Sequence, residues 1–94
     1  MNNPKIIRKH LQFFGRVQEV GFRYSSFSIA SELGLTGWVR NEWDGSVEME
    51  VQGTEEKIQK LIAMLDKRPF ISIQQIEEEQ LPIIDNEKKL KMLN

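Results

Sequence analysis

The stretch GRVQEVGFR, from Gly15 to Arg23, decides the fold and the candidate site of this chain. It joins a run with strand periodicity, residues 6–14, to a run with helical periodicity, residues 24–33. Its two glycines let the backbone turn sharply and approach a bound group closely. A loop that leads into a helix N-terminus leaves backbone N–H groups unpaired, and their partial positive charge favours an anion.

Arg23 falls in the first turn of the expected helix, next to this loop. Its guanidinium carries a planar fork of donors that matches the oxygens of a phosphate or a carboxylate. Taken alone, a glycine-rich loop of this kind is more often a plain tight turn, and Arg23 is equally well explained as a surface residue. Together, the loop and Arg23 gather many donors and few acceptors, so we interpret this region as the candidate site.

The composition is that of an ordinary globular protein and limits the possible functions. The 94 residues suffice for one domain, residues 1–94, with one modest core. Thirteen Lys and Arg against fourteen Asp and Glu give a formal net charge of -1, which argues against a general nucleic-acid binder. The lack of cysteine excludes disulfides and thiolate chemistry. No signal peptide or membrane-spanning run is recognisable, so we expect a cytoplasmic protein without membrane contact.

The rest of the chain continues to alternate between strand and helix periodicity. Further strands are expected at residues 35–40, 46–52 and 70–76, and a second helix between the N-cap Thr54 and Pro69. Gly34 has the position of a C-cap glycine, and Trp38 is expected in the core. The acidic run 77–79 is interpreted as a solvated strand end. Leu90 and Met92 alternate with lysines, which indicates a short final edge strand.

This order of elements predicts an α+β fold of the ferredoxin-like, split βαβ type. One antiparallel or mixed sheet is covered by two helices, with a fifth strand at one edge. The first two strands then run parallel with the third between them. Asn41, at the end of the second strand, is therefore expected at the same end of the sheet as the loop. An asparagine amide can orient a water through one donor and one acceptor. Asn41 alone is better explained as a residue of the Asp44-Gly45 hairpin.

The residues at hand point to catalysis by positioning. The sequence has no cysteine, its one histidine (His10) falls within the first strand, and no acidic cluster is typical of a metal site. Chemistry must therefore depend on orientation and electrostatics. That suits the attack of water on a phosphorus whose leaving group is already good.

Two blocks of the sequence match a known family pattern. The pattern Gly-x-Val-Gln-Gly-Val-x-Phe-Arg is read here as GRVQEVGFR, and GWVRNEWDGSVEMEVQG at residues 37–53 is similar to a second block. In both blocks the chain resembles the acylphosphatases. The resemblance implies that a small-molecule acyl phosphate is hydrolysed to a carboxylate and inorganic phosphate. It also implies that no metal, other cofactor or covalent intermediate is used.

The same resemblance implies roles for individual residues. Arg23 binds the phosphate, and Asn41 orients the attacking water. An oxygen of the substrate's own phosphate receives the water's proton. The phosphoryl oxygens are bound by backbone N–H groups of the loop, whose residues are Arg16, Val17, Gln18, Glu19, Val20 and Gly21.

Two positions depart from the family pattern. Glu19 stands where the pattern has its second loop glycine, and a positive φ there would cost it on the order of 1 kcal/mol. Its carboxylate would repel the substrate if it pointed inward. The alternatives are that it points to solvent or pairs with Arg16. Glu42 adds a second negative charge beside Asn41. We expect activity below the family norm, and the alternative is a phosphate-binding module without turnover.

The expected protein is a monomer that binds no nucleic acid. RNA-recognition domains of similar topology stack bases on aromatic residues of the open sheet face. In this chain Glu48 and Glu50 are expected on that face instead. Trp43, in the hairpin turn, is the aromatic residue predicted to contact the acyl group of a substrate.

Overall fold

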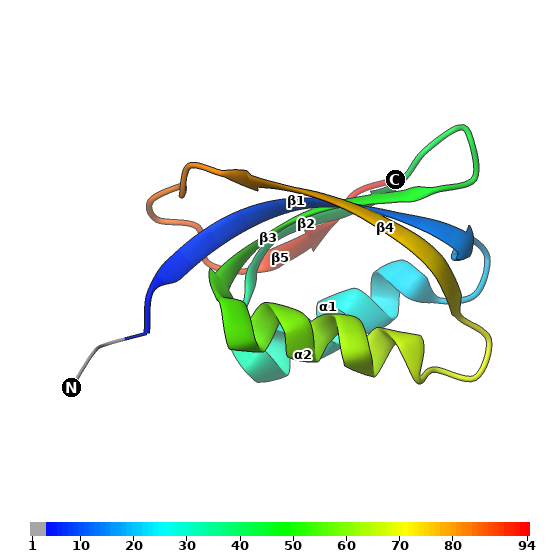
Figure 1. Ribbon diagram of the computed structural model, residues 1–94, viewed down its shortest axis with the longest axis horizontal. Helices are drawn as coiled ribbons and strands as arrows, with labels where there is room; N and C mark the ends of the chain where they lie inside the picture. Colours follow the sequence, from blue (N-terminus) through cyan, green and yellow to red (C-terminus); the bar gives the residue numbers. More distant parts are fainter. Residues whose placement is uncertain (1–3) are drawn as a thin grey trace.

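The computed structural model describes residues 4–94, which form one sheet with two helices packed on one of its faces (Figure 1). The strands are β1 (Ile6–Arg16), β2 (Thr36–Asn41), β3 (Val47–Thr54), β4 (Ser72–Leu81) and β5 (Leu90–Met92), and the helices are α1 (Phe22–Leu33) and α2 (Glu55–Asp66). The sheet order is β4-β1-β3-β2-β5. β2 and β5 pair in parallel, and the other described pairs are antiparallel. This confirms the predicted ferredoxin-like α+β fold, including its fifth strand.

The core lies between the sheet and the helices and follows the predicted periodicities. Alternate residues of β1 and β3 are fully buried, namely Leu11, Phe13, Val47, Met49 and Val51. The helices face them with Phe22, Ile29 and Ala30 from α1 and Ile58, Leu61 and Leu65 from α2. The rings of Phe13 and Phe22 lie 4.9 Å apart, so β1 is packed against the first turn of α1 directly beside the loop that joins them.

The helix ends form as local sequence rules predict. Gly34 follows α1 in the left-handed region, with φ 71°, as expected for a C-cap glycine. The Thr54 hydroxyl caps α2 by accepting a hydrogen bond from the Lys57 N–H at 3.2 Å. Within residues 4–94 neither helix is long and apolar enough to span a membrane.

Two predictions about the strands are wrong. β4 begins at Ser72 and continues through residues 77–79 to Leu81, pairing with β1 along the acidic run. An edge strand needs only backbone partners on its inner side, so charged side chains do not end it. Trp38 lies on the sheet face opposite the helices, 5.0 Å from the Arg40 guanidinium, while Val39 is buried. Successive side chains of a strand point to opposite faces of the sheet, so Trp38 cannot face the core when its neighbour Val39 does, whatever its size.

Two charged side chains of β1 are buried, one on each face of the sheet. Lys9 lies on the helix side, where its Nζ donates to Glu55 at 2.9 Å and Glu78 at 2.8 Å. Arg8 lies on the other side and is only 1% exposed. Its guanidinium donates to Glu50 and Glu87, both at 2.8 Å. Each of the two buried charges is paired with carboxylates, as burial of a charge requires.

Residues 82–89 carry the chain across the sheet, because β4 and β5 lie at opposite edges. Four strand spacings amount to about 19 Å, and eight extended residues reach about 26 Å, so the connection is long enough to cross. On the sheet face opposite the helices, the connection is held by the hydrogen bond that Arg8 donates to Glu87. It is also fixed by Gln52, whose side chain donates to the Ile84 carbonyl at 2.8 Å and accepts from the Ile84 N–H at 2.9 Å.

Glu87→Gln is expected to destabilise the fold by about 1–3 kcal/mol at pH 7, because it weakens the pairing of a buried arginine. Burial alone would raise the pKa of Glu87, but the hydrogen bonds and charge of Arg8 outweigh it and lower the pKa below its ordinary value of 4.5. The ionised Glu87 therefore stabilises the fold above pH 4.5, and this contribution is lost as the pH falls through the lowered pKa.

The test is urea unfolding of wild type and Glu87→Gln between pH 3 and pH 7. The difference in free energy of unfolding should be largest at neutral pH and should shrink below pH 4.5. Glu79→Gln is the matched control, because Glu79 is exposed on β4. A difference that is constant over this pH range would contradict the role assigned to the Arg8–Glu87 pair.

Candidate active site

The loop of residues 17–21 connects β1 to α1, with one glycine near the end of β1 and another at the N-cap of α1. Gly15 has φ 128° at a bulge between β1 and β4, where a Cβ would clash with the Ser72 carbonyl oxygen. Glycine is therefore required there. Gly21 is the N-cap of α1, with φ 77° and no side-chain cap. The first turn of the helix thus presents uncapped N–H groups next to the loop.

The backbone N–H groups of the loop are unpaired, and the side chain of Gln18 fixes the position of the loop. Within the described residues, no backbone N–H of residues 17–21 donates to a protein carbonyl or side chain. The Gln18 amide donates to the carbonyls of Glu42 at 2.7 Å and Ser46 at 2.8 Å. The loop is thereby tied to the β2–β3 hairpin, with its N–H groups available to an anion.

Arg23 is held by the last residues of the chain. Its Nη1 donates to the Leu93 carbonyl at 2.7 Å. The Leu93 N–H in turn donates to the Val39 carbonyl at 2.8 Å, which extends the pairing of β5 along β2. The guanidinium is therefore positioned by a neutral acceptor, and none of the ion pairs within residues 4–94 includes it.

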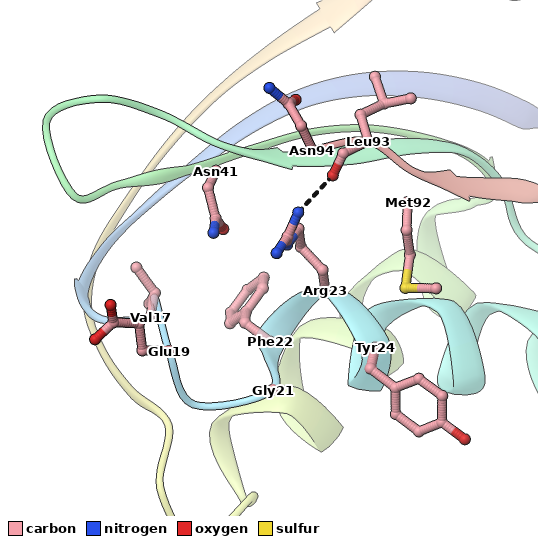
Figure 2. Close-up of a pocket in the computed structure, with 10 residues that line it drawn as sticks. All are labelled: Val17, Glu19, Gly21, Phe22, Arg23, Tyr24, Asn41, Met92, Leu93 and Asn94. Atoms are coloured by element: carbon pink, nitrogen blue, oxygen red, sulfur yellow. Dashed lines mark hydrogen bonds between the residues drawn. The ribbon is translucent and has the colours of Figure 1, made fainter.

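Asn41 is the last residue of β2. It lies at the same end of the sheet as the loop, because β1 and β2 run parallel with β3 between them. Its backbone N–H donates to the Asn94 carbonyl at 3.3 Å. Figure 2 shows its side-chain amide pointing into the space between the loop and Arg23. The predicted meeting of Asn41 and Arg23 at one pocket is confirmed.

A cavity of about 480 Å³ lies at this meeting point (Figure 2). It is lined by Val17, Glu19, Gly21, Phe22, Arg23, Tyr24, Asn41, Met92, Leu93 and Asn94. Five predicted site residues are among them: Val17, Glu19, Gly21, Arg23 and Asn41. The other three, Arg16, Gln18 and Val20, do not line it. One wall of the cavity is thus polar, with donors from the loop, Arg23 and Asn41.

Known proteins resemble this chain in sequence and in fold. The acylphosphatase family model matches residues 9–92. The chain belongs to the acylphosphatase family. An acylphosphatase of Bifidobacterium longum is 43% identical over 84 residues, which are 88% of this chain and 87% of the relative. The crystal structure of an acylphosphatase from Bacillus subtilis has a TM-score of 0.84 and 28% identity, covering 94% of this chain and 99% of that chain. An acylphosphatase structure from Coxiella burnetii has the same TM-score and 29% identity, covering 99% and 100%.

Membership of the acylphosphatase family supports the prediction that this chain is an enzyme acting on acyl phosphates. No finding favours the alternative, a phosphate-binding module without turnover. Within residues 4–94 no group of three or more histidine, aspartate or glutamate side chains is placed to hold a metal ion.

Glu19 replaces a glycine of the acylphosphatase loop pattern and adopts the backbone conformation that glycine favours. Its φ is 62°, which costs a non-glycine residue on the order of 1 kcal/mol. The side chain is exposed, and Figure 2 shows its carboxylate pointing away from Arg23 and Asn41. It belongs to none of the ion pairs within the described part of the chain, so it is not neutralised by Arg16. It remains a negative charge at the cavity wall.

The charge of Glu42, beside Asn41, is balanced. Arg40 Nε donates to Glu42 at 2.7 Å, and Arg40 Nη2 lies 2.8 Å from Glu48. His10 Nε2 lies 2.6 Å from the other oxygen of Glu48. Burial would raise the pKa of Glu48, but its hydrogen bonds with His10 and Arg40 outweigh burial and lower the pKa. This chain of charges lies on the open face of the sheet and leaves Arg23 as the cation at the cavity.

Sequence reasoning missed the apolar half of the cavity wall. Tyr24 and Met92 line the cavity, whereas Trp43 is 96% exposed at the hairpin tip and does not. The alternation of Leu90 and Met92 predicted the strand β5. It did not show which strand β5 pairs with, and that pairing alone brings the end of the chain to Arg23.

Glu19→Gly is expected to raise kcat/KM for benzoyl phosphate by roughly twofold to fivefold, because it removes a negative charge near the bound phosphate and relieves the backbone. Glu19→Gln removes the charge and keeps the strained conformation, so it separates the two effects. The measurement is the initial rate of benzoyl phosphate hydrolysis at low salt. A kcat/KM that is unchanged or lower in both variants would show that Glu19 does not limit activity.

Proposed function

We propose that this chain hydrolyses the carboxyl–phosphate bond of acyl phosphates, with Arg23 and the loop binding the phosphoryl group and Asn41 orienting the attacking water. One observation carries the proposal. The Arg23 guanidinium and the Asn41 amide face a single cavity, beside the free N–H groups of residues 17–21. The products are a carboxylate and inorganic phosphate.

Arg23 and the loop supply the positive potential that the transition state needs. Negative charge is spread over the phosphoryl oxygens during transfer, and donors that are already in place stabilise it without reorganisation. Arg23 is held in place by its 2.7 Å hydrogen bond to the Leu93 carbonyl, which leaves its other donors for the phosphate. Fixed donors of this kind do what a metal ion does at other phosphoryl-transfer sites, so we propose a metal-independent reaction.

Asn41 completes the reaction geometry. Its amide oxygen accepts one hydrogen of the water, and the water's lone pair attacks phosphorus as the phosphorus–oxygen bond to the acyl group breaks. The electron pair leaves with the carboxylate, and the water's proton passes to an oxygen of the transferred phosphate. A carboxylate is a good leaving group, since the pKa of its acid is about 4, so no general acid is needed.

The rest of the proposal concerns the protein as a whole. Residues 1–94 act as a single domain and a monomer in the cytoplasm, and nucleic acid is not a ligand. Glu48 and Glu50 support the last point, because they occupy the open sheet face and are paired there with His10 and Arg8.

The test is hydrolysis of benzoyl phosphate in the presence of a chelator, for wild type, Arg23→Ala and Asn41→Ala. We expect wild-type turnover to survive chelation and kcat to fall by roughly 100-fold or more in each variant. Arg23→Ala should also raise KM, because the arginine binds the phosphate in the ground state as well.

Arg68→Ala is the matched control, because Arg68 is exposed beyond the end of α2. Thermal unfolding verifies that each variant is folded. Absence of turnover by folded wild type, with inorganic phosphate still bound, would overturn the proposal and leave a binding module.

A further inference from the structure

A second cavity lies beside Trp38, on the sheet face opposite the helices. It has a volume of about 360 Å³ and is formed by β2, β5 and the connection of residues 82–89. Figure 1 shows this connection, in orange, at the end of the sheet away from the loop of residues 17–21. This space, the Trp38 cavity, shares only Leu93 with the cavity at Arg23, so it is a separate site.

Positive charge predominates at the wall of the Trp38 cavity. Three lysines line it, Lys88, Lys89 and Lys91, against one carboxylate, Glu87. That carboxylate is already bound by the Arg8 guanidinium, which donates to its two oxygens at 2.8 and 3.2 Å. None of the ion pairs within the described part of the chain includes any of the three lysines. Their ammonium groups are therefore available to an anion that carries several charges.

The indole of Trp38 gives the same cavity a flat apolar surface. The side chain is partly exposed, and the Arg40 guanidinium lies 5.0 Å from the centre of its ring. Arg40 is not among the residues that line the cavity, so part of the ring is accessible from it. Glu50, opposite Trp38 on β3, is bound by Arg8. Proteins bind the base and the phosphates of nucleotides with this combination of an accessible aromatic ring and nearby cations.

The wall that carries the lysines is held in position. The Gly37 N–H donates to the Lys89 carbonyl at 3.1 Å, and Lys91 is the partner of Trp38 in the pairing of β2 with β5. Asn86 has φ 65°, in the left-handed region, so the connection turns directly before the lysines. Because this backbone is already ordered, a ligand loses little of its binding energy to ordering it.

We propose that the Trp38 cavity binds a nucleoside diphosphate or triphosphate, with the base on the indole of Trp38 and the phosphates at the lysines of residues 88–91. Several lysines match a ligand with two or three phosphates better than one with a single phosphate. The volume falls within the range of small-molecule sites, about 300–1,000 Å³. Beyond Trp38 the open face carries Glu48 and Glu50, which disfavour a longer nucleic-acid chain. The inference does not depend on the proposed function, because the two cavities are separate.

The test is calorimetric titration of the protein with ADP at low salt, compared with adenosine and with pyrophosphate, which carry only the ring or only the phosphates. We expect ADP to bind, and each partial probe to bind more weakly by roughly tenfold or more. Trp38→Ala should weaken ADP binding by roughly tenfold, whereas Trp38→Phe keeps an aromatic ring and should retain most of the affinity. Lys88→Glu and Lys91→Glu should each weaken it by roughly tenfold, and less so at high salt. Lys60→Glu is the matched control, because Lys60 is exposed on α2, on the other side of the sheet.

Arg23→Ala distinguishes the Trp38 cavity from the cavity at Arg23, and it should bind ADP as tightly as wild type. Loss of ADP binding in Arg23→Ala, with the affinity retained in Trp38→Ala and Lys88→Glu, would assign the phosphates to the other cavity and overturn the proposal. Absence of ADP binding by folded wild type would also overturn it. Pyrophosphate that binds as tightly as ADP would contradict the role of Trp38 and leave a general anion site. None of these outcomes depends on the hydrolysis of acyl phosphates.

Discussion

The hydrogen bond from Arg23 to the Leu93 carbonyl, 2.7 Å long, is the contact on which the site depends. It fixes the guanidinium only if the end of the chain is itself fixed along β2. That in turn requires residues 82–89 to cross the sheet from β4 to β5. Their path is held at the opposite end of the sheet by Arg8, which is paired with Glu87 and buried. A charged network far from the cavity therefore helps to position Arg23.

The partners of the arginines explain why Arg23 can serve an anion. Arg8 and Arg40 each donate to carboxylates, and their charges are largely compensated within the fold. Arg23 instead donates to a backbone carbonyl, which orients it without neutralising it. A carboxylate in that position would compete with the phosphate for the same donors. The charge of Glu42 is balanced by its ion pair with Arg40. Glu42 therefore does not place an unpaired anion at the cavity, although it is next to Asn41 in the sequence.

Local sequence patterns were sufficient to predict the fold. Contacts between residues far apart in the sequence could not be predicted from such patterns. The caps at Gly34 and Thr54 and the alternation of β3 depend on neighbouring residues, and they formed as expected. Trp38 was misplaced because its size was given more weight than the alternation of its strand. The pairing of Arg8 with Glu87 joins residues 79 positions apart, and no short sequence pattern predicts it. The docking of Leu93 at Arg23 was missed for the same reason.

The two halves of the cavity come from different parts of the sequence. The polar half contains Glu19, Arg23 and Asn41, which lie in the two blocks that match the family pattern. The apolar half is built by Tyr24 and Met92, which lie outside those blocks. The one requirement that the phosphate site places on the end of the chain is a backbone carbonyl at position 93, and any residue supplies one. Substitution of the side chains at positions 24 and 92 would therefore leave the contact that holds Arg23 in place.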